Sequence, residues 1–137
     1  MRNTLVFAVA TWLAATAALA HHAPASLGTV RIAEPVMAGG APLAPGVYEI
    51  RDTGEHRAAL PGQSEESMVW VEFIADGKVV ARDGAEILDA SAEPAATSSR
   101  PAASHPRVEH LKGDEFVRIS TYHDNSRYVI YLPLMPH

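Results

Sequence analysis

The chain has 137 residues, with 16 Asp and Glu against 11 Lys and Arg, a formal net charge of −5 at pH 7, and no cysteine. The lack of cysteine excludes disulfides, thiolate metal sites and thiol catalysis. The acidic balance, with Lys and Arg scattered along the sequence, argues against nucleic-acid and anionic-membrane partners, which are bound by basic patches.

The first twenty residues have the three parts of a secretory signal peptide. Arg2 is their only charge, an apolar run follows at 5–10, and the segment ends in Ala18-Leu19-Ala20. The apolar part is too short, and too rich in Ala and Thr, for a membrane-spanning helix, which needs about 20 apolar residues. We expect cleavage after Ala20, a periplasmic or secreted location, and no stable membrane span afterwards. A retained amino-terminal anchor is the less favoured alternative.

Residues 21–137 are predicted to form one all-β domain, because short apolar patterns of period two recur between Gly, Pro and Asp clusters. In chain order the expected strands are Thr29–Val36, Val47–Asp52, Met68–Ala75, Lys78–Asp83, Ala85–Asp89, Arg107–Lys112, Glu115–His123 and Arg127–Leu134. This spacing is typical of a single antiparallel β-sandwich or small barrel of about seven to eight strands.

Two segments are predicted to be long loops. Residues 90–106 are almost wholly Ala, Ser, Thr and Pro, a composition that favours disorder. Residues 53–67 are polar and contain Gly54 and Pro61, and the sequence leaves open whether they are ordered. Either loop could become ordered when a ligand binds.

Turn chemistry sets the expected register of two hairpins. Around Asp76-Gly77, a two-residue turn mixes apolar and charged residues on one face, whereas a three-residue loop pairs Phe73 with Val79 and leaves one face apolar. The three-residue loop is therefore predicted. In the last hairpin a two-residue turn at 124–125 makes the same face apolar. These registers predict a core that includes Val71, Phe73, Val79, Val117, Ile119, Ile130 and Leu132. They also turn Trp70 outward, either under a loop or onto a binding face.

The segment Pro45-Gly46-Val47-Tyr48-Glu49-Ile50 and the closing Tyr128-Val129-Ile130-Tyr131-Leu132-Pro133 resemble small secreted bacterial β-domain proteins, in which a Leu-x-x-Gly-x-Tyr segment opens an early strand. The resemblance covers most of residues 21–137. It implies a β fold with Tyr48 as a core or corner aromatic. That group is functionally uncharacterised, so the resemblance implies no active site.

Three histidines form the candidate metal site: His21, His22 and His123. Cleavage after Ala20 would give His21 a free α-amine, and this amine and the His21 imidazole can chelate Cu(II) with a third nitrogen from a distant imidazole. The terminus resembles His-brace copper proteins over one or two residues only. Cleavage one residue earlier would instead create the amino-terminal copper and nickel motif Ala20-His21-His22. His123 follows as the candidate third ligand because Asp124 can orient its ring.

No catalytic constellation is found. Gly62-Gln63-Ser64 begins like a nucleophile elbow, but the second glycine of that motif is missing. The sequence therefore favours an exported, non-enzymatic β domain that binds or scaffolds an unidentified partner or small ligand in the cell envelope. It needs no cofactor in this interpretation. The alternative is a periplasmic copper-binding protein that uses His21.

Overall fold

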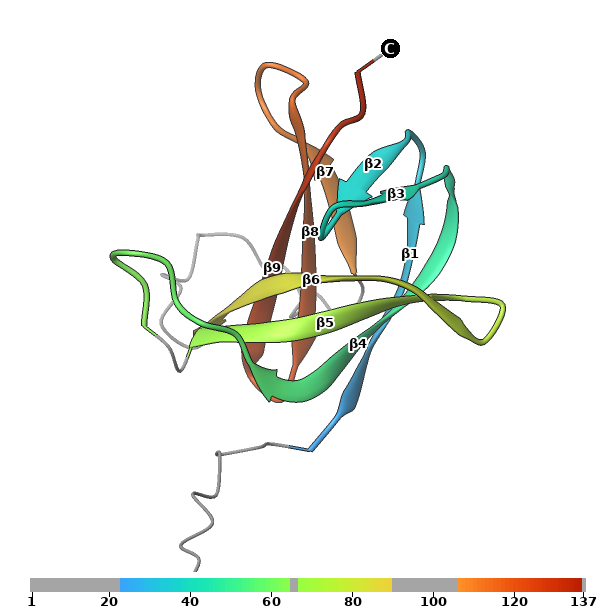
Figure 1. Ribbon diagram of the computed structural model, residues 1–137. Coiled ribbons are helices and arrows are strands. Elements are labelled where there is room, and N and C mark those ends of the chain that lie inside the picture. The colour runs from blue at the N-terminus through green and yellow to red at the C-terminus, as the bar shows by residue number, and fades with distance from the viewer. Residues whose placement is uncertain (1–22, 65–66, 90–105, 137) are drawn as a thin grey trace, which may run out of the picture.

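The structure is a computed structural model that describes residues 23–64, 67–89 and 106–136. The predicted signal peptide, His21, His22 and most of the predicted loop at 90–106 lie outside these ranges. The described part is all-β, as predicted, and none of it forms a helix long and apolar enough to cross a membrane. Its strands (Figure 1) are β1 (Ala25–Ile32), β2 (Val36–Ala38), β3 (Ala41–Leu43), β4 (Gly46–His56), β5 (Met68–Ala75), β6 (Lys78–Asp89), β7 (Arg107–His110), β8 (Phe116–His123) and β9 (Ser126–Pro133).

Seven strands form one antiparallel sheet in the order β1-β4-β5-β6-β9-β8-β7. The sheet curls until its two outer strands, β1 and β7, come into contact, so that it is nearly closed as a barrel. At this seam a Cβ added to Gly28 would lie 2.8 Å from Cγ of Pro106. Gly28 has a φ of 105° and follows a bulge in β1, so the close approach depends on its lack of a side chain.

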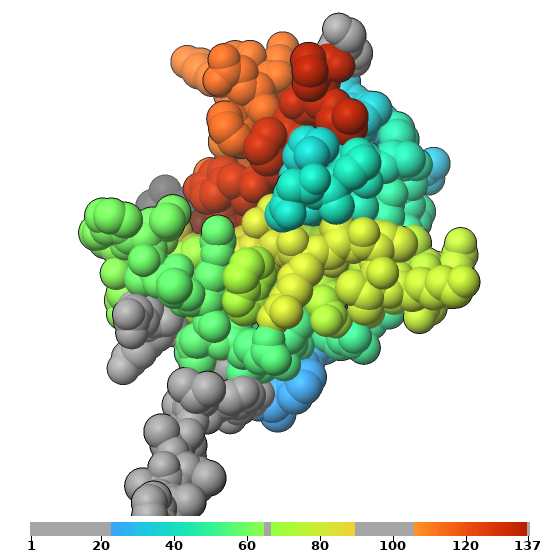
Figure 2. Space-filling view, viewed as in Figure 1, coloured from blue at the N-terminus to red at the C-terminus, as the bar shows by residue number. Residues whose placement is uncertain are grey.

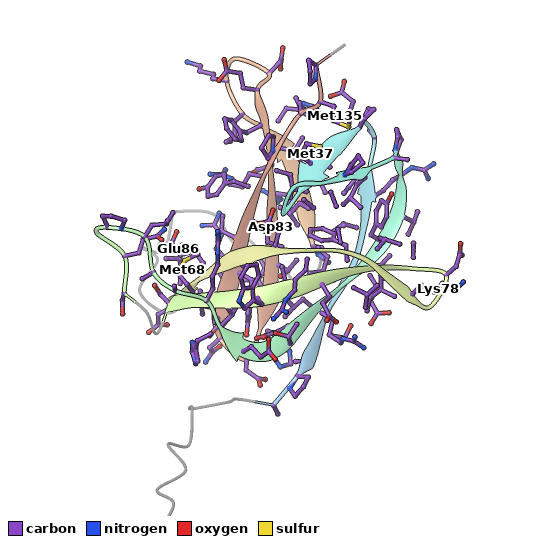
Figure 3. The ribbon with its side chains drawn as sticks, in the orientation of Figure 1. Met37, Met68, Lys78, Asp83, Glu86 and Met135 are labelled. Carbon is purple, nitrogen blue, oxygen red and sulfur yellow. The ribbon has the colours of Figure 1, made fainter. Side chains whose placement is uncertain are left out.

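One end of the barrel is closed by the β2–β3 hairpin. The hairpin packs against β6 and β9, and Figure 2 shows it in cyan between yellow β6 and the red carboxyl-terminal strand. The amide of Gly39 donates a 3.0 Å hydrogen bond to Oδ2 of Asp83, which Figure 3 labels on β6 below the hairpin. An isolated β-bridge between Val36 and Leu134 ties the hairpin to the chain that directly follows β9.

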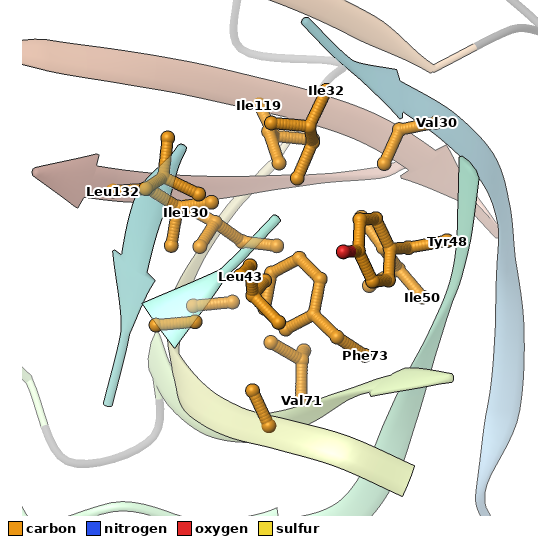
Figure 4. Close-up of a cluster of buried hydrophobic side chains, with 14 of the residues drawn as sticks. Val30, Ile32, Leu43, Tyr48, Ile50, Val71, Phe73, Ile119, Ile130 and Leu132 are labelled. Atoms are coloured by element: carbon orange, nitrogen blue, oxygen red, sulfur yellow. The ribbon is translucent and has the colours of Figure 1, made fainter. Parts of the chain in front are cut away.

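The core lies inside the barrel, and its most apolar part lies beneath this hairpin. Tyr48 and Phe73 meet edge to face, with ring centroids 6.5 Å apart (Figure 4), and the Tyr48 hydroxyl donates a 2.5 Å hydrogen bond to the carbonyl of Ala44. The largest fully buried apolar side chains are Phe73, Ile32, Ile50, Ile119, Ile130, Leu132, Val36, Val69, Val71 and Val117. Six of the seven predicted core residues are among the buried ones, and Val79 is not.

The strand predictions are largely confirmed, with three differences in how the chain is divided. The strand predicted at Thr29–Val36 is instead β1, which begins at Ala25 and ends at Ile32, while Val36 begins β2. β4 continues through residues 53–56, which were predicted to be loop, because pairing with β5 resumes at His56, opposite Val69, after an irregularity that follows Asp52. The two strands predicted at 78–83 and 85–89 are one strand, β6, which passes through Gly84. The sequence did not predict the β2–β3 hairpin, whose strands have only three residues each.

The two hairpin registers have different outcomes. The last hairpin is confirmed: Asp124 and Asn125 both have positive φ, and Ile119 pairs with Ile130. The first prediction is wrong, because the turn has only the two residues Asp76 and Gly77.

A bulge next to this turn explains the error. It falls between Phe73 and Ile74 and restores the apolar face by pairing Phe73 with Ala81, while Val79 pairs with Ile74 and stays 51% exposed.

Candidate functional site

The end of the barrel opposite the β2–β3 hairpin has a polar interior. Along β4 the inward positions run Tyr48, Ile50 and then Asp52, which is fully buried. On the neighbouring wall, Thr121 of β8 and Tyr128 of β9 are paired across the strands and are also buried. Strand alternation therefore continues, but the apolar side chains give way to a carboxylate, a hydroxyl and a phenol.

Asp52 and Tyr128 form the centre of this polar end. The Tyr128 hydroxyl donates a 2.9 Å hydrogen bond to Oδ2 of Asp52, and the Gly54 amide donates a 2.8 Å bond to the other carboxylate oxygen. Burial raises the pKa of Tyr128 above its ordinary value of 10.0, and the negative charge of Asp52 and the hydrogen bond to it act in the same direction. The phenol therefore stays protonated at neutral pH and acts as a hydrogen-bond donor.

Thr121 adds a further polar atom to this interior. Its Oγ1 is buried, and it has no hydrogen-bond partner among the described residues. A buried hydroxyl in this position costs stability relative to an apolar side chain of the same shape. The polar end is therefore not arranged for stability alone.

A pocket of about 400 Å³ opens beside this interior. Tyr128 belongs to both, because its hydroxyl bonds Asp52 while the residue also lines the pocket. The lining residues are Ala23, Pro24, Ala25, His123, Asp124, Ser126 and Tyr128. The pocket thus lies between the start of the described chain and the β8–β9 turn.

His123 is the one predicted metal ligand that the described residues contain, and it lines this pocket. Its Nε2 lies 3.1 Å from Oδ2 of Asp124, the neighbour expected to orient the ring. The His123 side chain is 38% exposed, so it is accessible to a ligand. Within the described ranges no three His, Asp or Glu side chains are grouped so that they could hold a metal ion.

The outer face of β4–β5–β6 carries a second set of polar contacts. As predicted, Trp70 faces outward, and the guanidinium groups of Arg57 and Arg82 lie 5.1 and 4.8 Å from the centre of its ring. Arg57 directly follows β4, and a Cβ added at Gly84 would clash with its guanidinium group. These cation–π contacts cover Trp70, which favours a packing role over a binding role.

Ion pairs balance the charges on the same face. Nη2 of Arg51 lies 2.6 Å from Oε2 of Glu72, and Arg82 forms an ion pair with Glu55. A shallow pocket of about 330 Å³ runs between these pairs and Pro24. Since Arg51 and Arg82, the arginines that line this pocket, each already have a carboxylate partner, this face is a weaker candidate for a ligand site than the polar end.

Sequence reasoning missed Asp52 and Tyr128 as a pair because they are 76 positions apart and meet only through the barrel. One signal was present in the sequence. Tyr48, Ile50 and Asp52 occupy alternate positions of one strand, so their side chains share a face, and the carboxylate of Asp52 is expected to point inward. Comparison of the chain with known protein-family models, with curated proteins and with solved structures found no match.

Proposed function

We propose that this protein is an exported, non-catalytic β domain that binds a small polar ligand at the polar end of its barrel. The observation that carries the proposal is the change of the barrel interior from apolar to polar at Asp52, Thr121 and Tyr128, next to a pocket of about 400 Å³. The mouth of a β-barrel is a common ligand site, and pockets of several hundred Å³ hold small molecules.

The side chains of the pocket favour binding over catalysis. Tyr128 is held protonated by burial and by Asp52, so it donates a hydrogen bond and does not act as a base or nucleophile near pH 7. His123 and Asp124 add an imidazole and a carboxylate at the rim, and Ser126 adds a hydroxyl. Together they offer donors and acceptors to a polar molecule.

The sequence at the amino terminus supports export. Arg2, the apolar run and Ala18-Leu19-Ala20 predict cleavage after Ala20. Cleavage there would leave only two residues ahead of Ala23, the first residue lining the pocket. The proposed ligand site would therefore lie next to the new amino terminus, and the proposed role is in the cell envelope.

The test is a nuclear magnetic resonance titration of the exported protein with a panel of monosaccharides and free amino acids. At least one compound is expected to shift the amide signals of His123, Ser126 and Tyr128. Ser126→Phe should abolish this response by filling the pocket. Ser64→Phe, which adds the same ring at an exposed loop position, is the matched control and should respond like the parent protein. Shifts confined to other regions, or no response to any compound, would contradict the proposal.

A second candidate function is copper binding by the new amino terminus. The observation that favours it is that His123 lines the same pocket as Ala23 and Ala25. Only His22 separates His21 from Ala23, so their Cα atoms are at most about 7 Å apart. The α-amine and imidazole of His21 would supply two nitrogens, and the His123 imidazole a third.

Copper titration of protein with the native terminus tests this candidate. Cu(II) should bind more tightly than Ni(II) and Co(II), and its affinity should fall with pH because protons compete for the nitrogens. Adding one Gly before His21 should weaken binding strongly, and His123→Ala should weaken it less. Equal binding by the native and Gly-extended proteins would exclude the site.

A further inference from the structure

Three arginines that are well separated in the sequence come together on the outer face of neighbouring strands. Arg107 lies on β7, Arg118 on β8 and Arg127 on β9, three strands that are adjacent in Figure 1. Strand alternation sends all three outward, because the intervening Ile119 and Tyr128 belong to the core. These three arginines are therefore far apart in the sequence but lie on one face of the sheet.

Glu109 is the carboxylate at the centre of these arginines. Its Oε2 lies 2.6 Å from Nη2 of Arg118, and its Oε1 lies 3.8 Å from Nη1 of Arg107. The hydrogen bond from Arg118 lowers the pKa of Glu109, and the charges of Arg118, Arg107 and Arg127 lower it further, while partial burial opposes them. Arg127 also donates a 3.2 Å hydrogen bond to Oγ of Ser120.

The cluster therefore carries excess positive charge on an acidic protein. Arg107 and Arg118 share the single carboxylate of Glu109, whereas the whole chain has a formal charge of −5. The outer face of β4–β5–β6 is different, because Arg51 and Arg82 each have their own glutamate and Arg57 lies over the ring of Trp70. The two arginine groups thus differ in their partners: two arginines share one glutamate in the first, whereas Arg51 and Arg82 have separate glutamates in the second.

An aromatic side chain extends the cluster. Tyr131 pairs across the strands with Arg118 and is 48% exposed, and Phe116 at the start of β8 is 39% exposed. We call Arg107, Glu109, Arg118, Arg127 and Tyr131 the arginine patch. Arginine and tyrosine are enriched at the centres of protein interfaces, and a guanidinium group binds carboxylates in a two-pronged geometry.

We propose that the arginine patch binds an acidic segment of a partner protein. Charge complementarity favours carboxylates, and the exposed Tyr131 and Phe116 favour a polypeptide surface with apolar groups. Heparin-like polysaccharides and anionic lipid bilayers are less favoured than an acidic polypeptide, because they have a higher density of negative charge and the net negative charge of the chain repels them more strongly. This inference is independent of the ligand site at the polar end.

The test is binding of fluorescently labelled poly-L-glutamate, followed by anisotropy at low and high salt. The folded protein is expected to bind at low salt and to release the probe at high salt. Arg107→Gln combined with Arg118→Gln should weaken binding by about tenfold, at about two- to fivefold for each exposed charge. Arg31→Gln combined with Lys78→Gln changes the net charge equally at exposed positions elsewhere, and should bind like the parent protein.

Glu109→Gln provides the complementary variant. It removes the carboxylate that occupies Arg118, so it should strengthen poly-L-glutamate binding by about two- to fivefold. Unfolding cannot imitate a gain in affinity, so this variant keeps the proposal testable even if the double arginine variant is unstable. The proposal would be overturned if the parent protein does not bind the probe, if the control pair loses as much affinity as the patch pair, or if Glu109→Gln does not strengthen binding. It would also be overturned if heparin or anionic phospholipid vesicles bind more tightly than poly-L-glutamate.

Discussion

The two ends of the barrel are built from the same strands but have opposite interiors. At the closed end, Tyr48 and Phe73 pack beneath the β2–β3 hairpin, and no carboxylate is among the buried side chains of the described residues there. At the other end, Asp52 and Tyr128 form a buried polar pair beside an open pocket. A single strand, β4, contributes to both. The comparison suggests that apolar packing at one end stabilises the fold, which lets the other end carry polar groups that are less favourable for stability.

The largest expected effect is at the closed end. Phe73→Ala removes a fully buried ring that contacts Tyr48, and should lower the free energy of unfolding by about 3–5 kcal/mol. Chemical denaturation measures this loss. Phe116→Ala removes the same ring from a position that is 39% exposed and should cost far less. Similar losses in the two variants would show that the closed end is not the main source of stability.

A smaller effect is expected at the polar end. Asp52→Ala removes the acceptor for the Tyr128 hydroxyl and the Gly54 amide, so it should cost about 1–3 kcal/mol in denaturant unfolding. Asp52→Asn keeps one acceptor oxygen and should cost less. If Asp52→Ala costs as much as Phe73→Ala, the two ends do not differ in the way proposed.

Alkaline pH should weaken the polar end selectively. The pKa of Tyr128 is raised in the folded protein, so the unfolded chain loses this phenolic proton first as the pH rises above its ordinary value of 10.0. The free energy of unfolding should therefore fall above about pH 10, by up to about 1.4 kcal/mol per pH unit. Tyr128→Phe should remove this part of the pH dependence, measured by unfolding at several pH values. Tyr131→Phe, at a half-exposed position, should keep it.

The smallest effect is expected at the tip of the β5–β6 hairpin. Val79 is 51% exposed, so Val79→Ala should change the free energy of unfolding by no more than about 0.5 kcal/mol. Denaturation alongside Phe73→Ala provides the measurement. A loss of several kcal/mol would instead support the three-residue loop, in which Val79 pairs with Phe73 in the core.

The fold was predictable where two independent signals agreed. At Asp124-Asn125 both turn residues tolerate positive φ and the flanking apolar pattern fits a two-residue turn, so the register was correct. At Asp76-Gly77 the turn residues favoured two residues, but the apolar pattern favoured three. The bulge beside Phe73 satisfies both, and a bulge leaves no clear mark in a single sequence.

The candidate site was predictable only in part. His123 was singled out from the sequence, and it does line the pocket. The Asp52–Tyr128 hydrogen bond was not foreseen, because β4 and β9 are not neighbours in the sheet and their pairing depends on how far the barrel closes. The arginine patch was missed for a similar reason, since it requires the order of β7, β8 and β9 in space.

The seam between β1 and β7 has a consequence for aggregation. Exposed strand edges template the addition of further strands from other molecules, unless their backbone groups are interrupted. Here the β1 edge carries the bulge that precedes Gly28, and the residue facing it, Pro106, has no amide hydrogen to donate. The β7 edge that follows is only four residues long. The same contact that brings the barrel close to closure therefore leaves little continuous edge for fibril-like growth, which protects a chain that has no disulfide to hold its strands together.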